Sequence, residues 1–380
     1  FTFTTKHHDG FSMYNTAAKV RKRRDHTTSK GGRVVDCDLH YSIMETPFGR
    51  DVTGELVHAC RNHGLGVGLY YSHIDWFDCD FRLDHWNYQY DPGYNRQSDP
   101  EGFSRFLARY EQQLVEICTQ YGKLDILSLD MGFPGFADDL EYRDYFRDHA
   151  HGAACGIRPD IVRIIKKIRR LQPDMLIRRR GIDPYGDYMS PERCVPTSEE
   201  AANATPLPWK VIYPGSNNFS FNYSDVYKPA SWVIENLIDI SAKGGVFQVG
   251  YGPAPNGTWP LQMQHRLKTV GEWLAVNGEG VYRTRALPVY GFGRKIRYTR
   301  SKDGQWLYAF VMQPDEACHA VVLPGIEAAE NAPVHMLGMD QPLKWQQDGR
   351  NVKLFMPDSF CERKNWPCEI AHCYRIKRPK

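Results

Sequence analysis

The sequence predicts a (β/α) barrel followed by a smaller antiparallel β-sandwich. Six short apolar runs of β-type residues occur before residue 255, and helix-like segments separate most of them. Strands that alternate with helices form βα units around a parallel sheet. Six units are two fewer than a closed eight-stranded barrel needs, so we expect an incomplete (β/α)8-type barrel. The helical periodicity is lost after residue 282, which predicts a β-sandwich for the rest of the chain.

The six expected barrel strands are rich in β-branched, leucine and aromatic residues. They are Phe1–Thr5, Leu65–Tyr71, Leu124–Asp130, Met175–Arg179, Lys210–Tyr213 and Gly245–Gly250. The expected helices repeat apolar residues at a spacing of three and four. They are Asp51–Asn62, Pro100–Tyr121, Pro159–Leu171, Ser231–Lys243 and Pro260–Val276. The first of these helices is followed by Gly64, a residue that favours a helix end.

The remaining part of the chain carries short β-type runs separated by turn pairs such as Asp303-Gly304 and Asp348-Gly349. These runs are Ile296–Thr299, Gln305–Met312, His319–Leu323, Val334–Leu337, Val352–Phe355 and Ala371–Ile376. We therefore expect two domains, a barrel over residues 1–282 and a β-sandwich over residues 283–380.

Composition excludes several classes of function. The net charge of +3 over 380 residues provides no broad basic surface for nucleic acid. No apolar run reaches the roughly 18 residues that a membrane-spanning helix needs. The basic cluster Arg21–Arg24 is short, and we expect it in a solvated loop. The cysteines show no spacing typical of a zinc site.

Candidate site residues follow the expected strands at their carboxyl ends, where βα barrels bind their substrates. In chain order they include His7, His8, Tyr70, Asp130, Arg180 and, in the loop after the fourth strand, Glu192, so the set holds two carboxylates. The set holds no serine or cysteine paired with a histidine, and no glycine-rich phosphate loop. Glycoside hydrolysis requires two carboxyl groups, donors for sugar hydroxyls and an apolar surface. This reaction fits the set better than any other.

Six segments resemble, in the same order, those of glycoside hydrolase family 29, the α-L-fucosidases. They are TTKHHDGFSMYNT, GLGVGLYYSHIDW, LDILSLDMGFP, RRRGIDPYGDYMSPE, the stretch from SFNYSDVYKPASW to GYGPAPNGTWP, and GEWLAVNGEGVYRTR. The resemblance implies a retaining exo-glycosidase that removes terminal α-L-fucose from oligosaccharides or glycoconjugates by double displacement. It implies a fucosylated glycan as partner, no metal or organic cofactor, and a secreted, periplasmic or lysosome-like location.

The resemblance also assigns roles. Asp130 is the expected nucleophile and Glu192 the expected acid/base, with Asp187, Glu199 and Glu200 as rivals for the second role. The residues expected to bind the sugar are His7, His8, Tyr70, Arg180 and Phe221. Each has a structural alternative. Asp130 would be a helix cap, Arg180 a salt-bridge partner and Glu192 a solvated loop acid. The two aromatic residues would be ordinary core, and the two histidines a hydrogen-bonded pair behind the site or metal ligands.

The chain departs from the family pattern at three places. Lys210 follows Trp209 where the family has a glutamate, and Ser128 stands where an aromatic residue usually precedes the nucleophile by two positions. The resemblance also implies that the chain begins at the third barrel strand. We therefore expect a fragment of a longer protein, with open sheet edges and an incomplete pocket.

Three alternative functions fit the same residues. A related glycosidase that acts on an α-L-galactoside would differ only at the fucose methyl group. A catalytically impaired fucose-binding protein is suggested by Lys210 and Ser128, and a metal-dependent hydrolase by His7, His8 and Asp9. A homo-oligomer is a further open alternative for the assembly.

Overall fold

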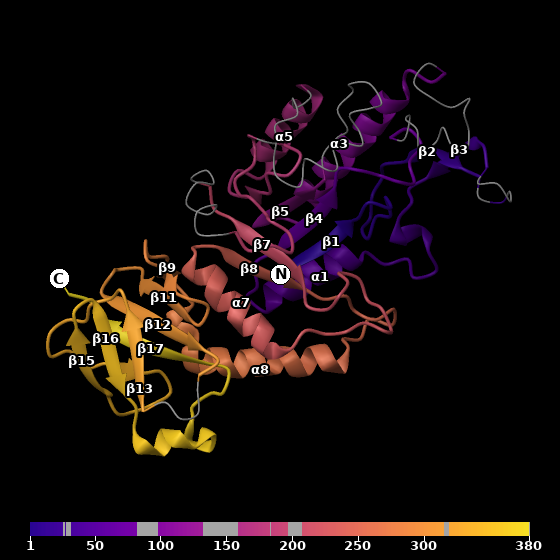
Figure 1. The fold of residues 1–380 in the computed structure, drawn as a ribbon. Coiled ribbons are helices and arrows are strands. Elements are labelled where there is room, and N and C mark those ends of the chain that lie inside the picture. The colour runs from indigo at the N-terminus through magenta and orange to yellow at the C-terminus, as the bar shows by residue number, and fades with distance from the viewer. Residues whose placement is uncertain are drawn as a thin grey trace. The chain divides into compact units, whose positions relative to one another are not determined.

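The structure is a computed structural model that describes residues 1–25, 27, 32–81, 98–131, 159–182, 184–196, 207–314 and 319–379. The chain forms two compact units, Phe1–Met189 and Ser190–Lys380. Figure 1 shows the first unit in indigo to magenta and the second in rose to yellow. Each unit is described by itself below.

The first unit contains a parallel sheet whose strand order is β1-β4-β5-β6. These strands are Thr2–Lys6, Gly68–Ser72, Ile126–Asp130 and Leu176–Ile177. Alternate side chains of the two central strands, such as Leu69 and Leu127, lie in one buried apolar core. The side chains between them, including Tyr70 and Asp130, therefore lie on the opposite face of the sheet. All four strands coincide with strands expected from the sequence.

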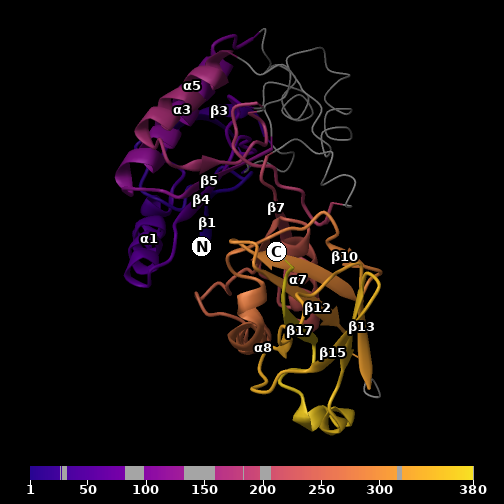
Figure 2. The same cartoon turned by 90° about the vertical axis from the view of Figure 1, so that its left-hand side faces the viewer.

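Helices cover the apolar face of this sheet. They are α1 (Val52–Asn62), α3 (Gly102–Gln120) and α5 (Pro159–Leu171). A 3-10 turn, η1 (Ile43–Glu45), precedes α1. Asp51 caps α1 by accepting a hydrogen bond from the Gly54 amide at 2.9 Å. Helices α3 and α5 lie side by side in Figures 1 and 2, and both contribute to the buried core. All three helices were expected from apolar spacing.

The basic cluster Arg21–Arg24 is not a loop, which corrects the sequence-based expectation. It belongs to β2 (Val20–Arg24), which pairs antiparallel with β3 (Val34–Leu39). Acidic residues of β3 face the basic residues of β2: Lys22 Nζ lies 2.6 Å from Asp36 Oδ1, and Arg21 pairs with Asp38. Cross-strand charge pairs thus support a strand that lacks apolar alternation.

The second unit begins with a parallel pair, β7 (Lys210–Pro214) and β8 (Val246–Gly250). Helices α7 (Ala230–Ala242) and α8 (Leu261–Asn277) follow these strands, lie side by side, and are succeeded by the turn η3 (Gly278–Gly280). With the sheet of the first unit, six strands are paired in parallel, as expected from the sequence.

Two antiparallel sheets complete the second unit. A six-stranded sheet has the order β10-β11-β12-β17-β14, with β9 also pairing to β11, and a three-stranded sheet has the order β13-β16-β15. Their strands are β9 Thr284–Arg285, β10 Gly291–Phe292, β11 Ile296–Ser301, β12 Trp306–Met312, β13 Ala320–Pro324, β14 His335–Met336, β15 Lys344–Asp348, β16 Asn351–Phe355 and β17 Ala371–Lys377. Two short turns, η4 (Asp358–Cys361) and η5 (Arg363–Asn365), precede β17.

The two antiparallel sheets share a buried apolar core that includes Tyr298, Leu323 and Val352. A second core joins α7 and α8 to the six-stranded sheet through residues such as Trp273 and Phe310. Strands β9, β10 and β15 were not expected, since the first two are only two residues long and β15 reads Lys-Trp-Gln-Gln-Asp. The domain boundary at residue 283 stays a prediction.

Candidate active site

The candidate site of the first unit lies at the carboxyl ends of β4, β5 and β6. The register pairs Tyr70 with Ser128 and Ser72 with Asp130. Because side chains alternate across a strand, all four of these residues lie on the face away from the helices. Arg178 and Arg180 follow β6 with the same two-residue spacing. Strand register thus brings together a carboxylate, a phenol and two guanidinium groups.

Asp130 is the centre of this cluster. Its Oδ1 accepts a hydrogen bond from Arg180 Nη1 at 2.7 Å and lies 3.1 Å from Arg178 Nη1. Its Oδ2 accepts a hydrogen bond from the Tyr70 hydroxyl at 2.5 Å. Asp130 is 8% exposed, so one carboxylate meets three donors in a largely dry setting.

The environment keeps Asp130 ionised. Burial by itself would raise the pKa of Asp130, but the charges of Arg178 and Arg180 and the hydrogen bond from Tyr70 hold this pKa well below its usual range. The contact has the opposite effect on the pKa of the phenol. Burial and the neighbouring Asp130 raise the pKa of Tyr70 far above its ordinary value. At neutral pH, Tyr70 is a hydrogen-bond donor and Asp130 is a carboxylate.

The paired histidines lie beside this cluster. The ring of His7 stacks on Tyr70 with centroids 5.6 Å apart and planes at 13°, and the rings of His7 and His8 are 3.9 Å apart. His8 Nδ1 lies 2.7 Å from Ser72 Oγ. Burial and the neighbouring His7 lower the pKa of His8 to about 4, so the ring is neutral at physiological pH. A neutral imidazole has one donor and one acceptor nitrogen, which suits it to sugar hydroxyls.

Five of the seven residues expected from the sequence are therefore together: Asp130, Tyr70, Arg180, His7 and His8. Glu192 and Phe221 belong to the second unit. Glu192 is exposed and forms a parallel backbone bridge with Ile212 of β7. Phe221 is half-buried and packs edge-on against Tyr223 at 4.8 Å. Their roles in one site with Asp130 stay a prediction.

Asp187, one of the rivals for the acid/base role, forms hydrogen bonds within the fold. Its Oδ2 accepts hydrogen bonds from Arg169 Nη2 at 2.8 Å and from the Ile177 amide at 2.7 Å. These bonds tie the loop after β6 back to the end of that strand. The other two rivals, Glu199 and Glu200, lie outside the described residues.

Sequence reasoning missed two residues that hold this site in place. Arg178 was passed over in favour of Arg180, although the two share a face of the extended chain. His73 was also missed; it is fully buried, with Nδ1 2.8 Å from the Tyr110 hydroxyl and Nε2 3.1 Å from the Arg180 carbonyl oxygen. A carbonyl oxygen only accepts, so Nε2 carries the proton and Nδ1 accepts from Tyr110. His73 thereby fixes the backbone that carries Arg180.

A buried ionic cluster supports the loop that carries the paired histidines. Lys6 Nζ donates to the carbonyl oxygens of Ser72 and Ile74 and lies 3.8 Å from Asp75 Oδ2. Arg109 Nη1 lies 2.6 Å from the same carboxylate oxygen. Gly10 has φ of +81° and passes so close to Asp75 that a side chain there would collide with the carboxylate. The Lys6-His7-His8-Asp9-Gly10 motif thus combines site residues with structural ones.

The metal-dependent alternative lacks support in this geometry. Within the described part of the chain, no three histidine, cysteine or acidic side chains are grouped closely enough to hold a metal ion. Asp9 instead accepts a hydrogen bond from the Phe11 amide at 3.1 Å.

Across the described residues, no helix combines the length and apolar character needed to cross a membrane.

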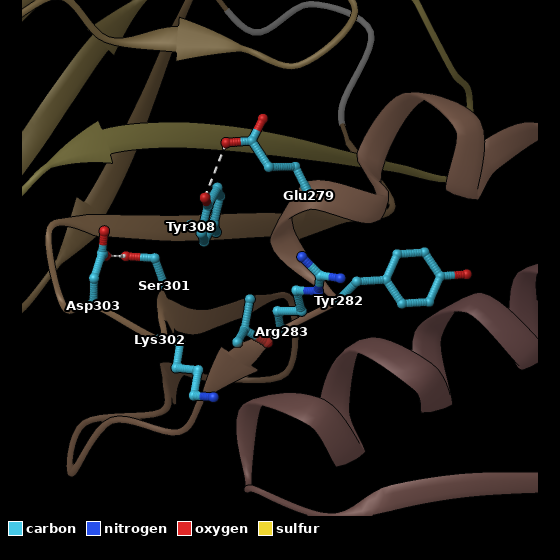
Figure 3. A pocket seen from close by; sticks show the side chains of 8 residues that line it. Glu279, Tyr282, Arg283, Ser301, Lys302, Asp303 and Tyr308 are labelled. Carbon is cyan, nitrogen blue, oxygen red and sulfur yellow. Dashed lines mark hydrogen bonds between the residues drawn. The ribbon is translucent and has the colours of Figure 1, made fainter.

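The second unit carries a separate shallow pocket of about 290 Å³, shown in Figure 3. Its two carboxylates are engaged in structural contacts. Glu279 accepts a hydrogen bond from the Tyr308 hydroxyl at 2.9 Å and pairs with Arg375, and Asp303 accepts from the Ser301 hydroxyl.

The parallel βα architecture and an ionised carboxylate among tyrosine, arginine and histidine side chains are typical of barrel glycoside hydrolases. A family model for alpha-L-fucosidase matches residues 1–279, and one for the alpha-L-fucosidase C-terminal domain matches residues 292–377. The chain belongs to the alpha-L-fucosidase family.

Known relatives agree with this assignment. An alpha-L-fucosidase of Dictyostelium discoideum is 23% identical over 82% of the chain, which spans 59% of that protein's length. The structure of alpha-L-fucosidase isoenzyme 1 from Paenibacillus thiaminolyticus superposes with a TM-score of 0.73 at 24% identity, covering 100% of this chain and 83% of the other. The expected barrel followed by a β-sandwich is thereby confirmed.

A third relative was solved as a trapped covalent intermediate. It is a GH29 alpha-L-fucosidase from Bacteroides thetaiotaomicron, in complex with 2-fluoro-fucosyl fluoride in a glutamate-to-glutamine mutant. It superposes with a TM-score of 0.70 at 20% identity, covering 99% of this chain and 78% of that chain.

Proposed function

We propose that this protein hydrolyses terminal α-L-fucosides with retention of configuration at the anomeric carbon. One observation carries the proposal: Asp130 is held ionised by two arginines and a tyrosine, next to two imidazoles suited to sugar hydroxyls. The family assignment and the covalent intermediate trapped in a relative support the same chemistry. The substrate class is a fucosylated oligosaccharide or glycoconjugate.

In the first step, an Asp130 oxygen attacks the anomeric carbon and forms a glycosyl ester while the bond to the leaving oxygen breaks. Glu192 gives its proton to the leaving oxygen. In the second step, Glu192 takes a proton from water, the water oxygen attacks the same carbon, and Asp130 leaves as a carboxylate. The mechanism requires the two carboxyl groups to be about 5 to 5.5 Å apart in the working enzyme.

The remaining site residues bind and orient the sugar. Neutral His8 and its neighbour His7 provide donors and acceptors for hydroxyls, and Arg180, whose side chain is 30% exposed, provides a charged donor at the edge of the cluster. Tyr70 donates to Asp130 and supports the ring of His7. Phe221 is proposed to pack against the apolar face that carries the fucose methyl group.

Hydrolysis of an aryl α-L-fucoside by the full-length protein tests this proposal. We expect turnover by the wild type, and product that forms first as the α-anomer by NMR. Comparison with the aryl α-L-galactoside separates the alternative glycosidase. Binding of fucose without turnover would instead support the binding protein suggested by Lys210 and Ser128 and would overturn the proposal.

A further inference from the structure

Arg178 stands out among the charged residues of the site because it is almost completely enclosed. Its side chain is 1% exposed, whereas that of Arg180 is 30% exposed, yet both contact the same oxygen of Asp130. A buried cation is costly unless an anion compensates it. The two arginines therefore differ in what they contact: the half-buried Arg180 is accessible to a substrate, and the enclosed Arg178 is not.

Strand register explains how an arginine fits at this position. Leu127 pairs with Ile177, and the Arg178 amide donates to the Leu127 carbonyl oxygen at 2.9 Å, which places Arg178 beside Ser128. Ser128 is buried and small, and its hydroxyl lies 3.3 Å from that of Tyr188. Tyr188 in turn forms a backbone bridge with Arg178. A small side chain on β5 thus leaves room for a guanidinium on the neighbouring strand.

We propose that Arg178 is a positioning residue that keeps Asp130 charged in the free enzyme and promotes its departure from the glycosyl ester. This inference rests on the proposed function. When a sugar occupies the site, Arg180 donates a hydrogen bond to the substrate. The enclosed Arg178 keeps its ion pair with Asp130, which water does not screen. Formation of the ester removes the negative charge and leaves a buried cation without compensation. Breaking of the bond between Asp130 and the anomeric carbon restores that charge.

The test compares Arg178→Met and Arg178→Lys with a matched control, Arg179→Met. Arg179 is the next residue along the same segment and is half-buried. For Arg178→Met we expect the midpoint of the Asp130 carboxyl titration, followed by NMR of the folded protein, to rise by about one to three pH units, the effect of removing an opposite charge beside a carboxyl group. The fucosyl-enzyme should accumulate in mass spectra during turnover. Arg178→Lys should restore part of the shift, and Arg179→Met should leave the midpoint in place.

An unchanged midpoint in a folded Arg178→Met protein, or an equal shift in Arg179→Met, would overturn the inference. A second readout does not depend on turnover. Asp130→Asn should lower the melting temperature more in the wild type than in the Arg178→Met background, because only the former retains an uncompensated buried cation. Equal changes in both backgrounds would overturn the inference as well. Wild-type protein that releases no fucose but shows this coupling would overturn the proposed function alone.

Discussion

Two ionic clusters of the first unit resemble each other in composition and differ in access to solvent. Asp130 meets Arg178 and Arg180, and Asp75 meets Lys6 and Arg109. The side chains of Asp75 and Lys6 are fully buried, and Asp75 Oδ1 also accepts hydrogen bonds from the amides of residues 77 and 78. Asp130 has an exposed partner on one side and the paired histidines nearby.

The difference teaches that similar ion pairs perform different tasks according to what surrounds them. Every oxygen of Asp75 is occupied by donors of the fold, so this carboxylate holds two loops together. Asp130 lies close to the paired histidines, and under the proposed function the same attraction sets the charge of the nucleophile. Substitutions in the Asp75 cluster should therefore reduce stability, and those in the Asp130 cluster should reduce activity.

The largest effect is expected for Asp130→Ala. Loss of the nucleophile should reduce kcat/KM for an aryl fucoside by about 10⁴-fold or more, as for other nucleophiles in covalent catalysis. Azide, a small anion that fits the space of the missing carboxylate, should restore part of the turnover and yield a fucosyl azide. Activity within tenfold of the wild type would show that Asp130 is not the nucleophile.

Asp75→Asn should have the next largest effect, on stability. It removes the carboxylate that Lys6 and Arg109 share and leaves Arg109 only its longer contact with Asp78 at 3.4 Å; breaking a buried pair costs about 3–5 kcal/mol. Asp36→Asn is the matched control, since its exposed pair with Lys22 should contribute less than about 1 kcal/mol. Urea unfolding measures both. Similar losses for the two variants would remove the distinction between buried and exposed pairs.

The pH dependence of stability should reveal the buried His73. Burial lowers the pKa of His73 to about 4 from its ordinary value of 6.5. Between these values the unfolded chain binds a proton that the folded chain does not, so stability is lost as the pH falls from 6.5 to 4, by about 3 kcal/mol. His73→Gln should remove that part of the slope, whereas the exposed His63→Gln should not. An unchanged slope in His73→Gln would indicate that His73 is protonated without cost.

The smallest of these effects is expected for Tyr70→Phe. The variant keeps the ring that stacks on His7 and loses only the hydrogen bond to Asp130. A hydrogen bond to a charged group contributes about 1.5–3 kcal/mol, which corresponds to a loss of about ten- to a hundredfold in kcat/KM. Tyr70→Ala should lose more. If both variants were equally impaired, the hydroxyl and the ring would not have separate roles.

The sequence predicted the six parallel strands because β-branched and apolar residues concentrate in them. It predicted that His7, His8, Tyr70, Asp130 and Arg180 lie together because barrels present side chains at strand ends, whereas the roles of the other two site residues stay predictions. It did not predict β2, whose basic residues are stabilised by the acids of β3 rather than by apolar burial. Arg178 and His73 were missed for a related reason. The partner of Arg178 lies on β5, and those of His73 lie on α3 and in the segment after β6. Such contacts depend on how distant elements pack and align, which local patterns do not encode.

Covalent trapping tests the central claim most directly. The protein, incubated with an activated 2-fluoro-fucoside and digested, should carry one 2-fluoro-fucosyl group on the peptide that contains Asp130, and Asp130→Asn protein should carry none. An adduct on a different carboxylate, or turnover of the aryl fucoside that proceeds with inversion at the anomeric carbon, would contradict the account.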